Sequence, residues 1–288
     1  MATVKVAALQ MRSGQDPARN AADFEALVRE AAASGAAYVQ SPEMTGALMR
    51  DKAALKAILK PQDEDPIAHA AARLAGELGI VVHVGSTAIA RPDGKVANRA
   101  FVFGPDGGLV ATYDKIHMFD VDLDNGESWR ESATYEPGTA STVVDLPFGR
   151  LGLAVCYDVR FPQLFRAQAL AGAQILTAPA AFTRQTGEAH WHVLQRARAI
   201  ENGAFVVTAA QGGRHEDGRE TYGHSLVVDP WGRVLAEADH DEAGVVLAEI
   251  DLGAVAEARA KIPNLRNARE FRVAHAGTAE LAEAGAAR

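Results

Sequence analysis

The chain has few side chains with the chemistry to react, and its only cysteine is the first to consider. Cys156 follows the apolar run 151–155 and precedes a polar corner over 157–160, after which Pro162 opens a helix-like segment. A thiol at a strand-to-helix corner is well placed as a nucleophile, because the N–H groups of a helix start stabilise a thiolate. A free cysteine is also a common buried core residue. The local pattern therefore leaves a catalytic and a packing role open.

Three charged residues stand at or just after predicted strand ends, where α/β proteins commonly build their sites. Glu43 ends the segment 36–43, Lys115 lies within 112–122, and Glu131 lies within 129–138. A carboxylate can accept the proton of a thiol, and an ammonium group can stabilise a developing oxyanion. Each residue taken alone is also typical of a solvated surface. The three become a candidate site only if the fold brings them to the cysteine.

The histidines do not form a metal-binding pattern. His190 and His192 fall on a predicted helix, where positions i and i+2 face different ways. The chain has one cysteine and neither a C-x-x-C nor an H-E-x-x-H motif. The sequence therefore predicts no metal ion, and nucleophilic chemistry by a thiol requires no organic cofactor.

The composition is that of an ordinary globular protein with an acidic balance. Of 288 residues, 29 are basic and 37 acidic, which gives a formal net charge of −8 and disfavours nucleic-acid binding. An anionic substrate would need a local cationic anchor. A single cysteine allows no disulfide within the chain, no uncharged run is long enough to span a membrane, and no secretion signal is evident. We therefore expect a cytoplasmic protein without a membrane segment.

Apolar strand-like runs alternate with helical patterns along the chain. The patterns predict helices over 16–35, 51–59, 64–78, 186–202 and from Pro162 onward, and strands over 3–10, 36–43, 80–89, 98–104, 109–115, 141–146, 150–156, 173–179, 204–211, 224–238 and 244–252. A Gly-rich polar loop is expected between the strands 204–211 and 224–238. No repeat or linker divides the sequence. We predict an α/β protein with mixed sheets, a single domain over 1–275 and a loose tail over 276–288.

Three ordered motifs make the sequence similar to a known superfamily. The stretches SPEMTG (41–46), YDKIHMFDVD (113–122) and GLAVCYDVRFP (152–162) resemble the Glu, Lys and Cys signatures of the nitrilase (carbon–nitrogen hydrolase) superfamily, and the likeness covers residues 3–270. The resemblance implies a four-layer α-β-β-α sandwich that assembles as a homodimer or a higher homo-oligomer. It also implies that Glu43 is the general base, Lys115 the oxyanion holder and Cys156 the nucleophile.

The resemblance further implies a cysteine-dependent amidase that works through a thioester acyl-enzyme. Glu131 stands ahead of the turn 136–138, where related enzymes place a second active-site glutamate, and Glu127 is a rival for that role. The backbone N–H of Tyr157 would join Lys115 at the oxyanion.

Two later stretches, 181–215 and 222–234, are similar to one branch of the superfamily. Its members act on deaminated glutathione, releasing 2-oxoglutarate and Cys-Gly, or on 2-oxoglutaramate, and the run AAQGGRH (209–215) favours the former. Both substrates carry a 2-oxo acid carboxylate, which Arg160 would bind by resemblance. An ion pair between Arg160 and Asp158 is the structural alternative. Phe182 and Thr186 fall where relatives line the pocket, although Phe182 is also an ordinary core aromatic.

Three more residues carry expectations. Glu188 stands where relatives often have proline. It suits a helix start, but it would repel an anionic substrate if it faced the pocket. His224 and Trp231 are expected to serve the fold, as a turn anchor and a packed aromatic. Two rival functions stay open: hydrolysis of another amide or an N-carbamoyl compound, and a catalytically silent scaffold, against which the intact Glu, Lys and Cys set argues.

Overall fold

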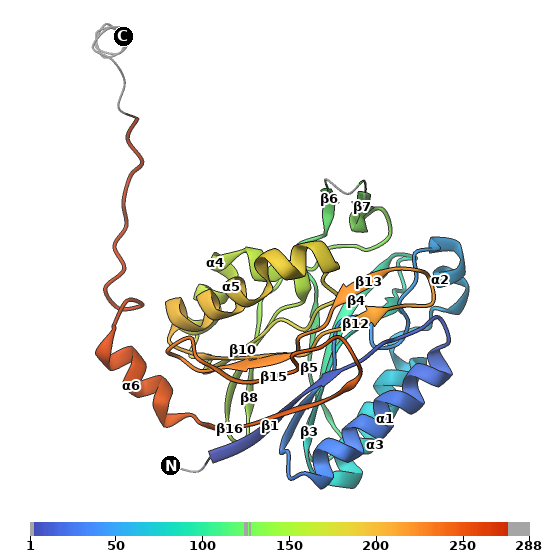
Figure 1. The fold of residues 1–288 in the computed structure, drawn as a ribbon, viewed down its shortest axis with the longest axis horizontal. Coiled ribbons are helices and arrows are strands. Elements are labelled where there is room, and N and C mark those ends of the chain that lie inside the picture. The colour runs from blue at the N-terminus through green and yellow to red at the C-terminus, as the bar shows by residue number, and fades with distance from the viewer. Residues whose placement is uncertain (1–2, 124–125, 127, 276–288) are drawn as a thin grey trace, which may run out of the picture.

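The structure, a computed structural model, describes residues 3–123, 126 and 128–275. Over these residues two six-stranded sheets pack face to face, with helices covering the outer face of each sheet (Figure 1). The layers therefore run α-β-β-α, with parallel and antiparallel pairs in both sheets. The predicted mixed α/β sandwich is confirmed.

The first sheet has the strand order β16-β1-β2-β3-β4-β5. Its strands are β1 (Thr3–Gln10), β2 (Tyr38–Gln40), β3 (Val81–Ala90), β4 (Val96–Phe103), β5 (Leu109–Asp114) and β16 (Gly244–Asp251). The strands β1, β2 and β3 are parallel, and their neighbours on both sides are antiparallel. Side chains along β1 alternate between two cores: Val6 and Ala8 face the other sheet, whereas Ala7 and Leu9 face the outer helices.

The second sheet has the order β15-β14-β11-β10-β9-β8. Its strands are β8 (Thr142–Leu146), β9 (Gly149–Leu153), β10 (Ile175–Thr177), β11 (Phe205–Thr208), β14 (Leu226–Val228) and β15 (Val234–Glu237). Here β9, β10 and β11 are parallel and flanked by antiparallel strands, which repeats the arrangement of the first sheet. The duplication is topological, because the sequence shows no repeat.

Four helices form the outer layers: α1 (Pro17–Ala33) and α3 (Pro66–Leu78) on the first sheet, and α4 (Pro162–Leu170) and α5 (Arg184–Asn202) on the second (Figure 1). The predicted start of α1 is confirmed, since the Asp16 side chain accepts a hydrogen bond from Ala18 N at 2.9 Å and Pro17 follows at the first helical position. The helix buries Phe24 and Val28 against the sheet. Capping and one apolar face thus place α1 as the sequence indicates.

Several elements differ from expectation. The strand predicted over 36–43 is only β2, so Glu43 lies in a turn beyond it. The Gly-rich segment is a hairpin of β12 (Gly212–Arg214) and β13 (Glu220–Tyr222), and another hairpin joins β6 (Asp120–Asp122) to β7 (Ser128–Arg130). Two further helices are α2 (Lys52–Ile58), shorter than predicted, and α6 (Gly253–Lys261), which was not predicted. Neither hairpin is predicted from the sequence, because the strands are too short to show an alternation of apolar and polar residues.

Two smaller expectations concern the surface and the tail. Trp231 was expected to be a packed aromatic, but it sits in the turn between β14 and β15 and is 51% exposed. None of the helices in the described part of the chain has both the length and the apolarity to cross a membrane. The tail predicted over 276–288 lies outside the described residues, and the single domain over 1–275 stays a prediction.

Candidate active site

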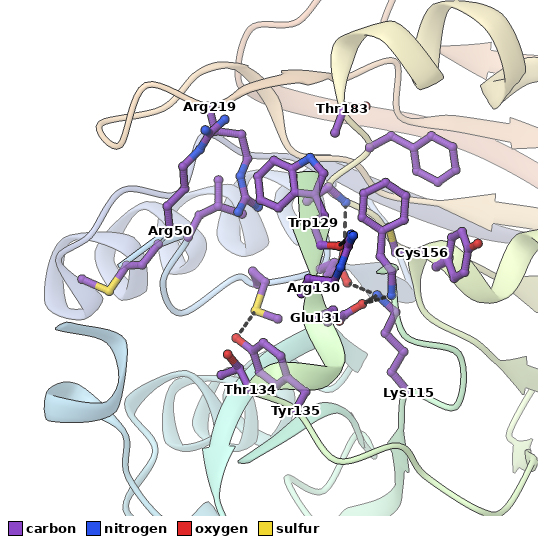
Figure 2. Close-up of a pocket in the computed structure, with 18 of the residues that line it drawn as sticks. Arg50, Lys115, Trp129, Arg130, Glu131, Thr134, Tyr135, Cys156, Thr183 and Arg219 are labelled. Atoms are coloured by element: carbon purple, nitrogen blue, oxygen red, sulfur yellow. Dashed lines mark hydrogen bonds and ion pairs between the residues drawn. The ribbon is translucent and has the colours of Figure 1, made fainter. Parts of the chain in front are cut away.

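A cavity of about 370 Å³ opens where loops from both sheets meet, and all four reactive side chains predicted from the sequence line it. Figure 2 labels three of them, Lys115, Glu131 and Cys156. Its wall combines carboxylates, cations and aromatic rings. The lining residues are Glu43, Met44, Ala47, Leu48, Met49, Arg50, Lys52, Leu55, Lys115, Phe119, Ser128, Trp129, Arg130, Glu131, Thr134, Tyr135, Cys156, Tyr157, Arg160, Ala181, Phe182, Thr183, Thr186 and Arg219.

Cys156 occupies a tight corner between β9 and a 3₁₀ turn, η3 (Cys156–Arg160). Its φ is +50°, a left-handed conformation that is unusual for a residue with a Cβ. The Cys156 N–H donates to the Pro179 carbonyl at 2.9 Å, which holds the corner against the segment after β10. A sulfur on a strained turn at the end of a strand projects into the cavity in the manner of a nucleophile elbow.

The fully buried Asp158 holds this corner rigid. Its carboxylate accepts hydrogen bonds from Val155 N at 2.9 Å and from the Tyr113 hydroxyl at 2.7 Å. It also accepts one from His117 N at 3.0 Å, and the His117 ring lies within 2.6 Å. Because Asp158 is used in this way, it does not form the alternative ion pair with Arg160. The aspartate instead ties the cysteine corner to β5 and the segment that follows it.

Glu43, Lys115 and Glu131 form a buried ionic triad beside the cysteine. The Lys115 Nζ lies 2.9 Å from Glu43 Oε1, and 2.9 and 2.8 Å from the two oxygens of Glu131. Cys156 lines the same cavity, and its thiol is among the groups that lower the pKa of the Glu43 carboxylate. The structure therefore brings together the four reactive residues singled out in the sequence. The rival Glu127 lies outside the described residues.

Uncharged groups also donate hydrogen bonds to the carboxylates of Glu43 and Glu131. The Asn98 side-chain amide donates to Glu43 at 3.0 Å and to Glu131 at 3.1 Å. Backbone N–H groups supply the remaining contacts: Ala181 N to Glu43 at 3.0 Å, and Phe119 N to Glu131 at 2.6 Å. A buried charge is stable only when it is paired and hydrogen-bonded in this way. Each carboxylate is consequently fixed in position.

The charges of the triad set its protonation. Burial alone would raise the pKa of Glu43, but the Lys115 charge and hydrogen bonds from Cys156, Lys115 and Asn98 hold that pKa below its ordinary value. Burial alone would lower the pKa of Lys115, but Glu131 and Glu43 raise it well above the usual range. Burial, followed by the negative charge of Glu43, raises the pKa of Cys156 well above that of a free thiol. The resting site therefore holds a thiol beside a carboxylate base.

The two sheets approach closely around this triad. A Cβ at Gly85 in β3 would lie 2.1 Å from the Ser41 carbonyl oxygen and 2.5 Å from Pro179 Cβ, so only glycine fits. The Gln211 side chain, which follows β11, donates to the Glu43 carbonyl at 3.0 Å. The glutamate of the first sheet is thus positioned by backbone and side chains of the second.

The predicted substrate-binding residues all line the cavity. The Arg160 guanidinium lies 5.3 Å from the Phe182 ring centroid and 5.8 Å from that of Tyr157, and its Nη1 lies 3.3 Å from His190 Nδ1. Burial lowers its pKa. The buried Phe182 also packs edge-on against Trp191, so it serves core and cavity together. Thr186, in the first turn of α5, is buried at the cavity wall.

The other residues considered in the sequence do not take part in the site around Cys156. Glu188 is exposed on α5 and pairs with Arg184 at 3.2 Å, so it does not face the cavity. His192 contacts Glu237 at 2.6 Å, and no cluster of metal ligands exists among the residues described. The His224 carbonyl accepts from the Trp191 indole at 2.8 Å, which agrees with a structural role.

Sequence reasoning missed several residues that support or line the site. Asn98 could have been noticed in the sequence, because it is a polar residue within the mostly apolar strand β4. Asp158 was considered only as a partner for Arg160, although its place two residues after the nucleophile marks a corner that needs support. Nothing in the sequence indicated that Arg50 and Arg219 would meet at Trp129, because loops that are distant along the chain bring them together.

The chain is similar to known proteins over most of its length. A family model described as carbon-nitrogen hydrolase matches residues 5–260. The deaminated glutathione amidase of Yersinia enterocolitica is 39% identical over 272 residues, which cover 93% of this chain and 94% of that protein. The omega-amidase NIT2 of Homo sapiens is 37% identical over 269 residues, or 93% and 96% of the two chains. The structure of the C. elegans NitFhit protein matches with a TM-score of 0.84 at 35% identity, covering 93% of this chain and 65% of that one.

Proposed function

The chain belongs to the carbon-nitrogen hydrolase family and is an amidase that acts on C–N bonds other than peptide bonds, and from this premise we propose that it hydrolyses amides of 2-oxo acids. The substrate we propose is deaminated glutathione (2-oxoglutaramyl-Cys-Gly), which would yield 2-oxoglutarate and Cys-Gly. The observation that carries the proposal is the buried Lys115, which bridges two carboxylates beside the Cys156 thiol in a cavity that Arg160 also lines.

In the first step the Cys156 sulfur attacks the amide carbonyl carbon while Glu43 accepts the thiol proton. The raised pKa of Cys156, caused by burial and by the Glu43 charge, requires proton transfer during attack rather than a preformed thiolate. The Lys115 ammonium and the Tyr157 N–H meet the oxyanion of the tetrahedral intermediate. A donor of this kind lowers the activation barrier by about 3–4 kcal/mol.

Collapse of the intermediate breaks the C–N bond and leaves a thioester on Cys156. Glu43 passes its proton to the departing amine, which leaves neutral. A water molecule then attacks the thioester carbonyl with Glu43 again as the base, and the carboxylic acid and the free thiol are released. Glu131 acts by holding Lys115, since both of its carboxylate oxygens accept from that ammonium. The residues present perform every step without a metal or an organic cofactor.

Recognition of the acyl group is assigned to Arg160. Among the described residues this guanidinium has no carboxylate partner, and it faces the cavity over Phe182. A planar guanidinium binds a carboxylate through two parallel hydrogen bonds, which suits a 2-oxo acid. It is also the local cation that a protein with a net charge of −8 needs for an anionic substrate.

The second candidate is omega-amidase activity on 2-oxoglutaramate, which has the same acyl group and releases ammonia. The identity to the omega-amidase NIT2 relative, 37%, is close to the 39% of the deaminated glutathione amidase, so similarity alone does not separate the two. Other amides and N-carbamoyl compounds lack the 2-oxo carboxylate. A silent scaffold would have no use for a buried ionic triad beside a thiol.

The direct test is a panel of amides. The purified protein is incubated with deaminated glutathione, 2-oxoglutaramate, a short aliphatic amide and an N-carbamoyl amino acid, while 2-oxoglutarate, Cys-Gly and ammonia are followed. We expect the first compound to have the highest kcat/KM. Turnover of only the last two would overturn the substrate assignment and leave the amidase class intact.

A matched variant tests the enzyme class. Cys156→Ala should fold normally by circular dichroism and lose turnover, and mass spectrometry of the wild-type protein stopped during turnover should show the mass of the acyl group on Cys156. Equal activity of variant and wild type would contradict a cysteine mechanism and favour the scaffold.

We also propose that the protein is a cytoplasmic homodimer. A catalytic thiol works in a reducing compartment. Apolar side chains are exposed on α5 at Val193 and Ile200 and on the adjacent turn at Trp231, with exposed fractions of 69%, 52% and 51%. Burial of such side chains against a second copy is favourable. Light scattering after size exclusion should give twice the mass of the chain, and a monomer would contradict the proposal.

A further inference from the structure

Three guanidinium groups in the cavity wall have no carboxylate partner within ion-pair distance in the described part of the chain: Arg160, Arg50 and Arg219. The proposed function uses only Arg160. Of the other cavity cations, Lys115 bridges the triad, Arg130 pairs with Asp122 at 2.8 Å, and Lys52 donates to the Arg130 carbonyl at 3.4 Å. Arg50 and Arg219 therefore remain as positive charge that the hydrolysis of a singly anionic amide does not require.

Arg50 and Arg219 meet at one aromatic ring. Their guanidinium carbons lie 4.9 and 4.2 Å from the Trp129 ring centroid. Figure 2 shows the two arginines on one side of Trp129, and Cys156 and Lys115 on the other. The cavity thus has a second cationic end, here called the distal end and defined by Arg50, Trp129 and Arg219.

The distal end is held together at an electrostatic cost. Burial lowers the pKa of Arg219 and the nearby charge of Arg50 lowers it further, while Asp217 opposes the shift. The Arg219 Nε is buried without a hydrogen-bond partner among the described residues, as is Asp217 Oδ2. The two side chains form no ion pair within 4 Å, and the Asp217 carboxylate accepts from Arg219 N at 2.9 Å. A buried donor without a partner is costly, and a ligand that accepts from it removes that cost.

We propose that Arg50 and Arg219 bind the terminal carboxylate of the leaving group. This inference rests on the proposed function, because it takes the acyl end of the substrate to lie at Arg160. Two cationic positions in one cavity fit a substrate with a carboxylate at each end, joined through the scissile amide near Cys156. A dipeptide leaving group that ends in glycine has such a carboxylate, whereas ammonia has none. The distal end is thus a specificity determinant for N-substituted 2-oxo amides over primary ones.

The exposed position of Arg50 fits this role. Arg50 lies in the segment just before α2 and is exposed, whereas Arg219 comes from the β12–β13 hairpin and is partly buried. One exposed and one partly buried cation allow a peptide end to enter from solvent and then be held. Planar guanidinium groups suit a carboxylate better than ammonium groups do, since each offers two parallel donors.

The test compares two amides that differ only in the terminal charge. Wild-type protein is assayed with 2-oxoglutaramyl-Cys-Gly and with the same compound carrying a glycine carboxamide. We expect kcat/KM to be higher for the carboxylate by about tenfold, the value of one charge-assisted hydrogen bond. The ratio should fall toward one in Arg219→Gln and in the Arg50→Gln/Arg219→Gln double variant, with the loss in KM.

The matched control is Arg214→Gln, an exposed arginine of the same hairpin that does not line the cavity. This variant should keep the wild-type ratio, which separates the local contact from the net charge. A wild-type ratio near one, or a ratio that survives in the double variant, would overturn the inference.

A binding measurement separates this inference from the proposed function. Calorimetric titration of the Cys156→Ala protein with Cys-Gly and with Cys-Gly amide needs no turnover. Tighter binding of the carboxylate form, lost in Cys156→Ala/Arg219→Gln, supports the distal end even if no 2-oxo amide is hydrolysed. If 2-oxo amides are hydrolysed but the two dipeptides bind equally, the role proposed for the distal end is refuted. The proposed function would still stand.

Discussion

The ammonium group of Lys115 lies 2.9 Å from the Glu43 carboxylate in a region where their side chains are only 1% and 6% exposed. Such a pair is stable because Glu131 and Asn98 satisfy the remaining donors and acceptors. The pair keeps Glu43 ionised and Lys115 charged in the same place. Base and oxyanion holder are thereby prepared before any substrate arrives.

Glu43→Gln should lower the rate of amide hydrolysis and raise the rate at which the Cys156 thiol is alkylated. Loss of the general base should reduce kcat by about 10²- to 10⁴-fold. Loss of the Glu43 charge removes one cause of the raised pKa of Cys156, so more thiolate is present at pH 7.5 and alkylation by iodoacetamide should accelerate. Amidase assays and mass-spectrometric alkylation rates measure the two opposite effects. Glu188→Gln on the exposed face of α5 is the control and should change neither; slower alkylation of Glu43→Gln would contradict this electrostatic account.

Lys115→Met should destabilise the fold as well as abolish activity. Two buried carboxylates then face each other without a cation, which costs about 3–5 kcal/mol when one partner of a buried pair is removed. Urea denaturation measures the change in the free energy of unfolding. Adding Glu131→Gln to Lys115→Met removes one of the two charges and should recover part of the loss. An unchanged midpoint for Lys115→Met would show that the triad is solvated and not buried.

Asn98 is a positioning residue, and its substitution should act through the carboxylates. Asn98→Ala removes the donor shared by Glu43 and Glu131 and should lower kcat by about tenfold, the scale of one hydrogen bond to a charged group, with little change in KM. Asn98→Asp adds a third negative charge and should be worse than alanine. The acid limb of the pH profile should also move upward in Asn98→Ala, because Asn98 helps to lower the pKa of Glu43. A purely structural role would leave that limb in place.

The pH dependence of kcat/KM follows from two groups whose pKa values are shifted, Glu43 and Cys156. The pKa of Glu43 is lowered from 4.5, so the base stays ionised at neutral pH, and kcat/KM falls only as the pH drops through that lowered pKa. The pKa of Cys156 is raised from 9.0, so thiol ionisation introduces no limb in the neutral range. We expect a flat kcat/KM between pH 6 and about pH 8. A steep limb between pH 6 and pH 7, with the fold intact by circular dichroism, would contradict these assignments.

Arg160 should control recognition of the 2-oxo acid. Arg160→Gln removes the charge that the acyl carboxylate would meet and should raise KM for 2-oxoglutaramate about 10- to 100-fold, as expected for a bidentate charge-assisted contact. Arg160→Lys should recover only part of the loss because an ammonium lacks the planar fork. Hydrolysis of a short neutral amide supplies the comparison. Equal KM increases for neutral and anionic amides would assign Arg160 to packing.

Much of the fold could be predicted because its elements carry local signals. Asp16 and Pro17 mark the start of α1, and Pro162 marks that of α4. Alternating apolar residues mark β1 as a strand, and the structure buries both of its faces. The resemblance of three motifs also placed Glu43, Lys115 and Cys156 in one site.

What could not be predicted depends on contacts between distant loops. The hairpin that carries Arg219 has three-residue strands, which are too short to show a period. Asn98 joins two carboxylates that lie 55 and 33 residues away in sequence. The duplicated strand order of the two sheets left no trace in the residue pattern, since apolar residues of many kinds fill equivalent core positions.

The protonated state of Cys156 at rest has a consequence for the durability of the protein. Peroxides and other oxidants attack the thiolate, and the first product, a sulfenic acid, leads on to irreversible forms. Because burial and the Glu43 charge raise the pKa of Cys156, the idle enzyme exposes little of the vulnerable anion. In the proposed mechanism the thiol loses its proton as it attacks the substrate, so the arrangement that delays ionisation would also preserve the enzyme between encounters with its substrate.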